Sequence, residues 1–190
     1  NYTKEQDDLE SVINWVVNTE NYKNEINSSS IALIGHSRGG GTVLLKANEN
    51  DKITKVITLA GVSDYKSRFP TGEILEQWKK DGVAYITNGR TNQQMPHFYQ
   101  FYENFVANEE KLNVKKATEN LAIPHLIIHG DNDTSVTLAE AENLKKWNAD
   151  ATLAIIENTD HVFNTSHPWE KENIPEEFQK IISLSIDFLK

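Results

Sequence analysis

A short apolar run that ends in a glycine-rich turn constrains the fold of this chain more than any other feature. Ile31–Ile34 is typical of a strand buried on both faces, because its apolar residues follow one another without alternation. The segment Gly35-His36-Ser37-Arg38-Gly39 comes directly after it, and Thr42–Asn48 is predicted to be the helix that leaves the turn. A buried strand, a sharp turn and a helix form the unit from which parallel sheets with helical connections are built.

The rest of the chain repeats this alternation. Apolar side chains at helical spacing predict a first helix over 3–19, with Thr3 as the candidate N-cap. Further strands are expected at Lys55–Ala60, Pro124–Gly130 and Thr152–Ile156, and further helices at Ala139–Trp147 and Pro175–Lys190. One domain is the natural expectation for 190 residues. The sequence therefore predicts a single α/β domain over 1–190 with a parallel, doubly wound sheet.

The segment 62–120 lies between two predicted strands and is too long for a simple crossover. Within it, Val83–Met95 alternates around Asn88-Gly89, which predicts a hairpin. We interpret 62–120 as a cap-like insertion that lies over the ends of the strands. The aromatic side chains of the insertion fit two roles equally well: the lining of a pocket for an acyl or aryl group, or a small core that holds the insertion together. These residues are Tyr65, Phe69, Trp78, Tyr85, Phe98, Tyr99, Phe101, Tyr102 and Phe105.

The composition excludes several classes of protein and site. There are 19 Lys and Arg against 28 Asp and Glu, and the resulting formal charge of −9 argues against binding to nucleic acid or to an anionic membrane. Because the chain has no cysteine, disulfides, thiolate catalysis and Cys-based metal sites are excluded. No apolar run approaches the ~20 residues of a membrane-spanning helix, and no signal peptide is visible. We therefore expect no membrane span. A cytoplasmic location is favoured, while a signal peptide upstream of Asn1 remains open because residues before it are expected to be missing.

Ser37 is the candidate nucleophile. A serine hydroxyl attacks an acyl group efficiently only when a base removes its proton. Its oxygen must therefore protrude from a sharp strand-to-helix bend, and glycines on either side remove side chains that would clash there. Gly35 and Gly39 occupy the positions two residues before and two residues after the serine.

An acid and a base follow Ser37 in the chain order that this chemistry uses. Asp133 lies three residues after Gly130, at the carboxyl end of a predicted strand, and His161 lies in a short loop after the next strand. The carboxyl ends of parallel strands meet at one edge of a sheet, where the sites of open α/β sheets lie. We therefore predict that Ser37, Asp133 and His161 come together.

These motifs resemble those of the α/β-hydrolase superfamily. The similarity is carried by Gly35–Gly40, by Ile127–Asp133 with Val136, and by Asp160–Phe163, and it covers the chain apart from the insertion. Within the superfamily, the chain is most similar to the dienelactone-hydrolase-like and prolyl-oligopeptidase-like esterases. The fold implied by this resemblance is the C-terminal part of an α/β-hydrolase.

The resemblance also implies roles for individual residues. Ser37 would be the nucleophile, His161 the general base and then acid, and Asp133 the residue that orients His161. The backbone N–H of Arg38 is implied as one donor of the oxyanion hole. Asp64, just after the second predicted strand, is the alternative acid, because some members of the superfamily keep their acid there.

The implied reaction is the hydrolysis of a small-molecule carboxylic ester through an acyl-enzyme intermediate. Peptide or amide cleavage and acyl transfer use the same triad, and a non-catalytic module of the same fold is a further alternative. No cofactor and no metal are expected, since the six histidines form no metal-binding pattern with carboxylates. We interpret one of them, His129, as a structural residue at a strand end.

The chain departs from the superfamily at its beginning. An α/β-hydrolase sheet normally has several strands before the one that carries the serine, whereas only one predicted helix precedes Ile31–Ile34 here. That strand would be an exposed apolar edge, which proteins ordinarily avoid. The loop that usually donates the second oxyanion hydrogen bond would also be missing. We therefore expect this chain to be the C-terminal part of a longer hydrolase, or a second chain to complete the sheet.

Overall fold

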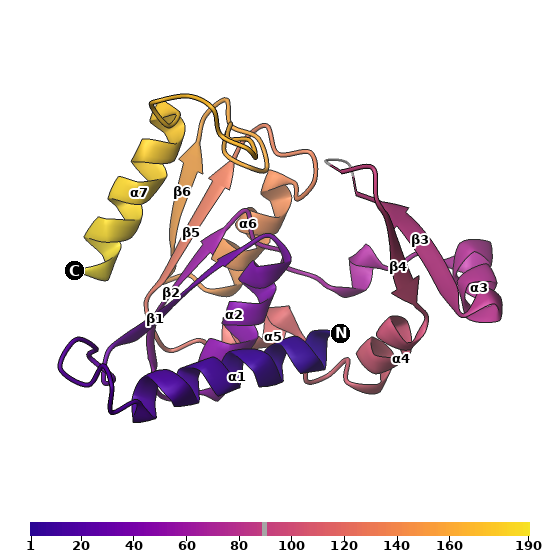
Figure 1. Cartoon of the computed structure of the whole chain (residues 1–190), viewed down its shortest axis with the longest axis horizontal. Coiled ribbons are helices and arrows are strands. Elements are labelled where there is room, and N and C mark those ends of the chain that lie inside the picture. Colours follow the sequence, from indigo (N-terminus) through magenta and orange to yellow (C-terminus); the bar gives the residue numbers. More distant parts are fainter. Residues whose placement is uncertain (89–90) are drawn as a thin grey trace.

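A computed structural model describes residues 1–88 and 91–190 of the chain (Figure 1). Within these residues the main sheet has four parallel strands in the order β1-β2-β5-β6. The strands are β1 (Ile31–His36), β2 (Ile53–Leu59), β5 (His125–Gly130) and β6 (Thr152–Ile156). The predicted α/β class with a parallel sheet is thus confirmed, and each strand lies where the apolar runs predict it.

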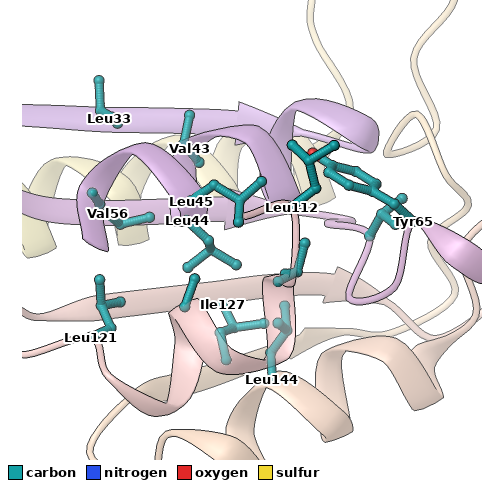
Figure 2. Close-up of a cluster of buried hydrophobic side chains, with 14 of the residues drawn as sticks. Leu33, Val43, Leu44, Leu45, Val56, Tyr65, Leu112, Leu121, Ile127 and Leu144 are labelled. Carbon is teal, nitrogen blue, oxygen red and sulfur yellow. The ribbon is translucent and has the colours of Figure 1, made fainter. Parts of the chain in front are cut away.

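Helices cover both faces of this sheet, as expected for a doubly wound fold. On one face lie α1 (Tyr2–Asn18), α2 (Arg38–Glu49), α5 (Val114–Glu119) and α6 (Leu138–Trp147), and on the other lies α7 (Glu176–Leu189) (Figure 1). The larger core fills the first interface, where Leu44 of α2, Ile127 of β5 and Leu144 of α6 are fully buried (Figure 2). The smaller core joins Ile128 of β5 to Ile181 of α7.

Two helix starts differ from their predictions. Thr3 was predicted to cap α1, but that prediction is wrong: the Asn1 side chain accepts the hydrogen bond from the backbone N–H of Lys4, at 3.0 Å. Asparagine is among the best N-caps, because its short side-chain oxygen reaches the free N–H groups of the first turn. The second helix begins at Arg38, directly after Ser37, and not at Thr42 as predicted. Glycines at the first helical positions hide this start from sequence patterns, because glycine is a poor helix former.

The connection between β2 and β5 carries short elements that are not part of the main sheet. They are η1 (Lys66–Arg68), α3 (Gly72–Asp81), β3 (Val83–Thr87), β4 (Gln94–Phe98) and α4 (Gln100–Ala107). We call residues 66–107 the cap. β3 and β4 form the predicted antiparallel hairpin, in which Ile86 pairs with Met95, a pairing that was not predicted, while Gly89 of the predicted turn lies outside the described residues. Figure 1 shows the hairpin and α3 on the side of the molecule away from α7. The last helix of the connection, α5, packs instead on α2 and α6.

Strand β1 is the edge of the described sheet. It pairs with β2 alone among the described strands, and the side chain of Ile34 is 51% exposed. The exposed apolar edge predicted for this strand is therefore present. None of the helices in the described part of the chain is long and apolar enough to cross a membrane.

Candidate active site

Ser37 sits at the sharp bend between β1 and α2. Its backbone has φ 56° and ψ −123°, a conformation that residues other than glycine rarely adopt. The bend is held from the neighbouring strand, because the N–H of Ser37 donates to the carbonyl of Leu59 at 2.9 Å and its own carbonyl accepts from the N–H of Val62 at 3.0 Å. Strain that is held in this way at one residue is typical of a functional position.

The two glycines that flank the serine are not equivalent. A Cβ atom on Gly35 would lie 2.2 Å from the carbonyl oxygen of Gly39, so no side chain fits there. The same clash was predicted for Gly39, but a Cβ there would meet nothing within 4 Å, so this prediction is wrong. The second close approach falls one residue later, where a Cβ on Gly40 would lie 2.6 Å from Cα of Gly61. Gly40 therefore lets α2 pack against the end of β2.

His161 reaches Ser37 from the loop after β6. Its Nε2 lies 3.0 Å from the Ser37 hydroxyl oxygen, within hydrogen-bond distance. The His161 side chain is 21% exposed, so the ring borders solvent and is not sealed in the core. His36, within the elbow, bonds through its Nε2 to the backbone carbonyl of His161 at 2.8 Å and thereby ties the elbow to this loop.

Asp133 lies on the far side of His161, where its Oδ2 is 2.7 Å from Nδ1 of the ring. Its Oδ1 accepts the backbone N–H groups of Ser135 and Val136, each at 2.8 Å. The carboxylate is fully buried, so these three bonds take the place of its lost hydration. Asp64 makes no such contact; it is exposed, and its carboxylate accepts the N–H of Lys66 in a local turn.

The structure therefore brings Ser37, Asp133 and His161 into one hydrogen-bonded row and leaves Asp64 outside it. Nε2 of His161 faces the serine hydroxyl, and Nδ1 faces the carboxylate. In that arrangement the ring can accept the serine proton while the carboxylate keeps the ring's orientation and tautomer. Arg38 is the first residue of α2, so its N–H has no acceptor within the helix and is available to a ligand.

A cavity of about 950 Å³ opens directly above this row. Ser37, Arg38, Val62 and His161 line it, and most of the other lining residues belong to the cap. The cap side chains that line the cavity include Phe69, Ile74, Trp78, Tyr85, Ile86 and Phe101. The indole N–H of Trp78 donates to the carbonyl of His97 at 2.8 Å, so this ring is held in place and offers its carbon atoms to the cavity. The lining is mainly apolar, as in ligand pockets generally.

The aromatic residues of the insertion fill both of the roles left open by the sequence. Tyr65 and Phe105 are buried in the core that joins the cap to the body, and the Tyr65 hydroxyl donates to the carbonyl of Arg38 at 3.0 Å. Tyr65 also lines the cavity, together with Phe69, Trp78, Tyr85 and Phe101. Tyr2 is a cavity residue that the sequence reasoning missed, and it stacks on Tyr65 with the ring centroids 4.0 Å apart. Burial raises the pKa of Tyr2 to about 12, so its phenol stays neutral beside the site.

Residues 1–180 of the chain match the prolyl oligopeptidase family. No curated protein sequence matches the chain. Its structure is similar to the esterase domain of a Rhodothermus marinus protein, with a TM-score of 0.56, 18% identity, and coverage of 84% of this chain and 61% of that one. It is also similar to Est1E from Butyrivibrio proteoclasticus, with a TM-score of 0.71, 18% identity, and coverage of 100% and 71% of the two chains.

A third similar structure is the monoacylglycerol lipase of Paleococcus ferrophilus, with a TM-score of 0.68, 17% identity, and coverage of 99% and 74% of the two chains. Est1E has also been solved with ferulic acid bound. The chain thus spans 61–74% of the length of these three proteins, and at these identities the likeness concerns the fold. The family match over 1–180, together with the parallel sheet and the serine elbow, establishes the relationship. The chain belongs to the prolyl oligopeptidase family, within the α/β-hydrolase superfamily.

Proposed function

We propose that this protein is a serine hydrolase that cleaves carboxylic esters through a covalent acyl-enzyme. The observation that carries the proposal is the position of His161, whose ring nitrogens lie 3.0 Å from the Ser37 hydroxyl and 2.7 Å from the Asp133 carboxylate. A base held between a nucleophile and an orienting acid is the arrangement that makes a serine reactive.

The proposed reaction has two halves. Oγ of Ser37 attacks the ester carbonyl carbon while His161 takes the hydroxyl proton, and the charge on the carbonyl oxygen is stabilised by the N–H of Arg38. His161 then gives the proton to the departing alcohol, and the bond between the carbonyl carbon and the alcohol oxygen breaks. In the second half His161 activates a water molecule, which releases the acid and regenerates Ser37.

The cavity supports a substrate with a bulky apolar or aryl group. Ile74, Tyr85 and Ile86 line the cavity but are 70%, 64% and 53% exposed, so a ligand there would cover apolar surface that water now contacts. Each Å² of such surface contributes roughly 25 cal/mol when it is buried. Est1E, which has a similar fold, has been solved with ferulic acid bound, and this supports an aryl acid as a candidate acyl group for this protein.

A panel of p-nitrophenyl esters tests the substrate class. We expect kcat/KM to rise from the acetate to the butyrate and longer esters, and to be higher for methyl ferulate than for methyl acetate. The substitution Tyr85→Ala should lower kcat/KM for the bulky esters about tenfold and leave the acetate nearly unchanged, because only the bulky groups reach this wall. Phe98→Ala is the matched control, since Phe98 lies on the same hairpin and is 62% exposed but does not line the cavity. Equal effects of the two substitutions on bulky esters would contradict this assignment.

Membership of the prolyl oligopeptidase family favours peptide cleavage as a second candidate. The same three residues serve both reactions, so ester and peptide cleavage are distinguished by the leaving group of the substrate, which is an alcohol in an ester and an amine in a peptide. We expect p-nitrophenyl esters to be cleaved much faster than p-nitroanilides of proline-containing peptides. Comparable turnover of the anilides would make the protein a peptidase, and failure of Ser37 to react with a fluorophosphonate probe would favour a non-catalytic module.

We also propose that further strands cover the free edge of β1. The support is the exposed edge with its half-exposed Ile34, and the greater length of the proteins with similar structures. An unpaired parallel edge leaves its backbone N–H and C=O groups ready to bind another strand. The isolated 190-residue polypeptide is therefore expected to self-associate in sedimentation experiments, with low esterase activity. A monomer with full activity would contradict this proposal, and a defined active dimer would indicate that a second chain completes the sheet.

A further inference from the structure

His129 lies inside the molecule directly beneath the Asp133 loop. It belongs to β5, its side chain has no exposed surface, and it does not line the cavity. Its Nε2 is 2.7 Å from the carbonyl oxygen of Val136 and 3.5 Å from Oδ2 of Asp133. A strand residue from the core thus contacts the loop that carries the proposed catalytic acid.

The protonation of this ring follows from its surroundings. A carbonyl oxygen only accepts hydrogen bonds, so the proton of the neutral ring lies on Nε2 and is donated to Val136. Burial lowers the pKa of His129, which keeps the ring uncharged at neutral pH. An uncharged ring does not compete with His161 for the negative charge of Asp133.

Both backbone polar groups of Val136 are hydrogen-bonded to neighbouring side chains. The N–H of Val136 donates to Oδ1 of Asp133 at 2.8 Å, and its carbonyl accepts from His129 at 2.7 Å. The 133–136 turn is thereby fixed through both the N–H and the carbonyl of Val136. With Oδ1 occupied by the turn, Oδ2 is the oxygen that remains directed at His161.

We propose that His129 is a positioning residue of the hydrolase, acting through Val136 and Asp133 on the orientation of His161. This rests on the proposed function, in which Asp133 orients the base. The bond from His129 to Val136 anchors the 133–136 turn to β5, which is buried along its whole length. Without that bond, the turn keeps the longer hydrogen bond from the N–H of Asp133 to the carbonyl of Gly130, at 3.4 Å, but loses the shorter one that fixes Val136 to β5.

Two substitutions at this position separate the hydrogen bond from the packing. His129→Gln keeps an N–H donor at the place of Nε2, because this atom lies four bonds from Cα in both side chains. His129→Met has a similar length but no donor. We expect kcat for p-nitrophenyl butyrate to fall about 10- to 100-fold in His129→Met, as for a small displacement of a catalytic group, with KM changed little. His129→Gln should restore most of kcat.

The matched control is His125, on the same face of the same strand. It is equally buried, its Nε2 bonds to the hydroxyl of Thr58 at 3.0 Å, and burial lowers its pKa to about 4. It is four residues from His129, or about 13 Å along the strand, at the end away from Asp133. His125→Met should lower the melting temperature about as much as His129→Met does, but leave kcat within about twofold of the native value.

A second measurement does not depend on turnover. The proton between Nδ1 of His161 and Asp133 is expected to give a downfield ¹H resonance in the histidine-labelled protein. It should weaken or shift upfield in His129→Met and persist in His129→Gln and His125→Met. If His129→Met does not fold, His129→Asn serves instead, because its amide is too short to reach Val136.

The outcomes distinguish this inference from the function on which it rests. Equal kcat and an unchanged resonance in His129→Met would overturn the positioning role, even in an active hydrolase. A protein without any ester hydrolysis would overturn the proposed function, while the resonance would still report whether His129 holds Asp133 against His161. Loss of kcat in His129→Gln to the level of His129→Met would show that the hydrogen bond is not the cause.

Discussion

Replacing Ser37 with alanine is expected to abolish ester hydrolysis, with a loss of about 10⁶-fold in kcat. The substitution removes the only atom that can form the acyl-enzyme in the proposed reaction, and Nε2 of His161 loses the partner that lies 3.0 Å away. Folding should be unaffected, because the strained backbone of the elbow is held by main-chain bonds to Leu59 and Val62 and not by the hydroxyl. Initial rates with p-nitrophenyl butyrate, measured beside a melting curve, give this result.

The control for this substitution is Ser183→Ala. Ser183 lies on α7, on the opposite face of the sheet from α2, and the one hydrogen bond that its side chain makes to the described residues stays within its own helix, from the hydroxyl to the carbonyl of Gln179 at 3.0 Å. It should keep the native rate. A fluorophosphonate probe should label the native protein and Ser183→Ala but not Ser37→Ala. Normal hydrolysis by Ser37→Ala would exclude Ser37 as the nucleophile.

Replacing Asp133 with asparagine is expected to lower kcat by about 10⁴-fold while leaving the fold intact. An amide is nearly the same size as the carboxylate, and its oxygen can still accept the N–H groups of Ser135 and Val136. Its NH₂ group would then occupy the place of Oδ2 and donate to Nδ1 of His161. The proton of the neutral ring would therefore lie on Nε2. A ring in that state cannot accept the proton of Ser37.

Asp64→Asn tests the alternative acid under the same conditions. The Asp64 carboxylate bonds to backbone N–H groups of its own turn, at Lys66 and Ser67, and makes no contact with His161 among the described residues. We expect little change in kcat. A larger loss in Asp64→Asn than in Asp133→Asn would move the acid to the end of β2.

The elements that form the row of Ser37, Asp133 and His161 could be predicted because each depends on a local pattern. An apolar run without alternation predicts a buried strand, and glycines with a serine between them predict a strained turn. The rule that the carboxyl ends of parallel strands meet at one edge then brings three distant loops together. The hydrogen bonds that join the three side chains could not be predicted, because they depend on distances that are set only when the chain has folded.

Other parts of the molecule could not be predicted because their causes are not local. Gly39 fits the same pattern as Gly35, yet only Gly35 faces a neighbouring carbonyl, because the curvature of the bend decides which Cβ points inward. The cap helices α3 and α4 were not predicted from the sequence. Both helices are short, ten residues in α3 and eight in α4, so their helical spacing of apolar residues, such as Ile74 with Trp78 and Phe101 with Phe105, extends over only about two turns.

His129 has one feature that could be predicted from the sequence and one that could not. Its place at the end of a buried strand follows from the sequence, but its bond to Val136 depends on a turn that folds back over the strand.

By itself, the sequence determined the α/β class, the order of the strands along the chain and the position of the serine elbow, because hydrophobic runs and glycines act through near neighbours. The tertiary structure decided which acid faces His161, which glycine is required and which rings line the cavity. These depend on contacts between residues far apart in the chain, such as Ser37 with His161 at 3.0 Å, and such contacts exist only once the sheet has formed.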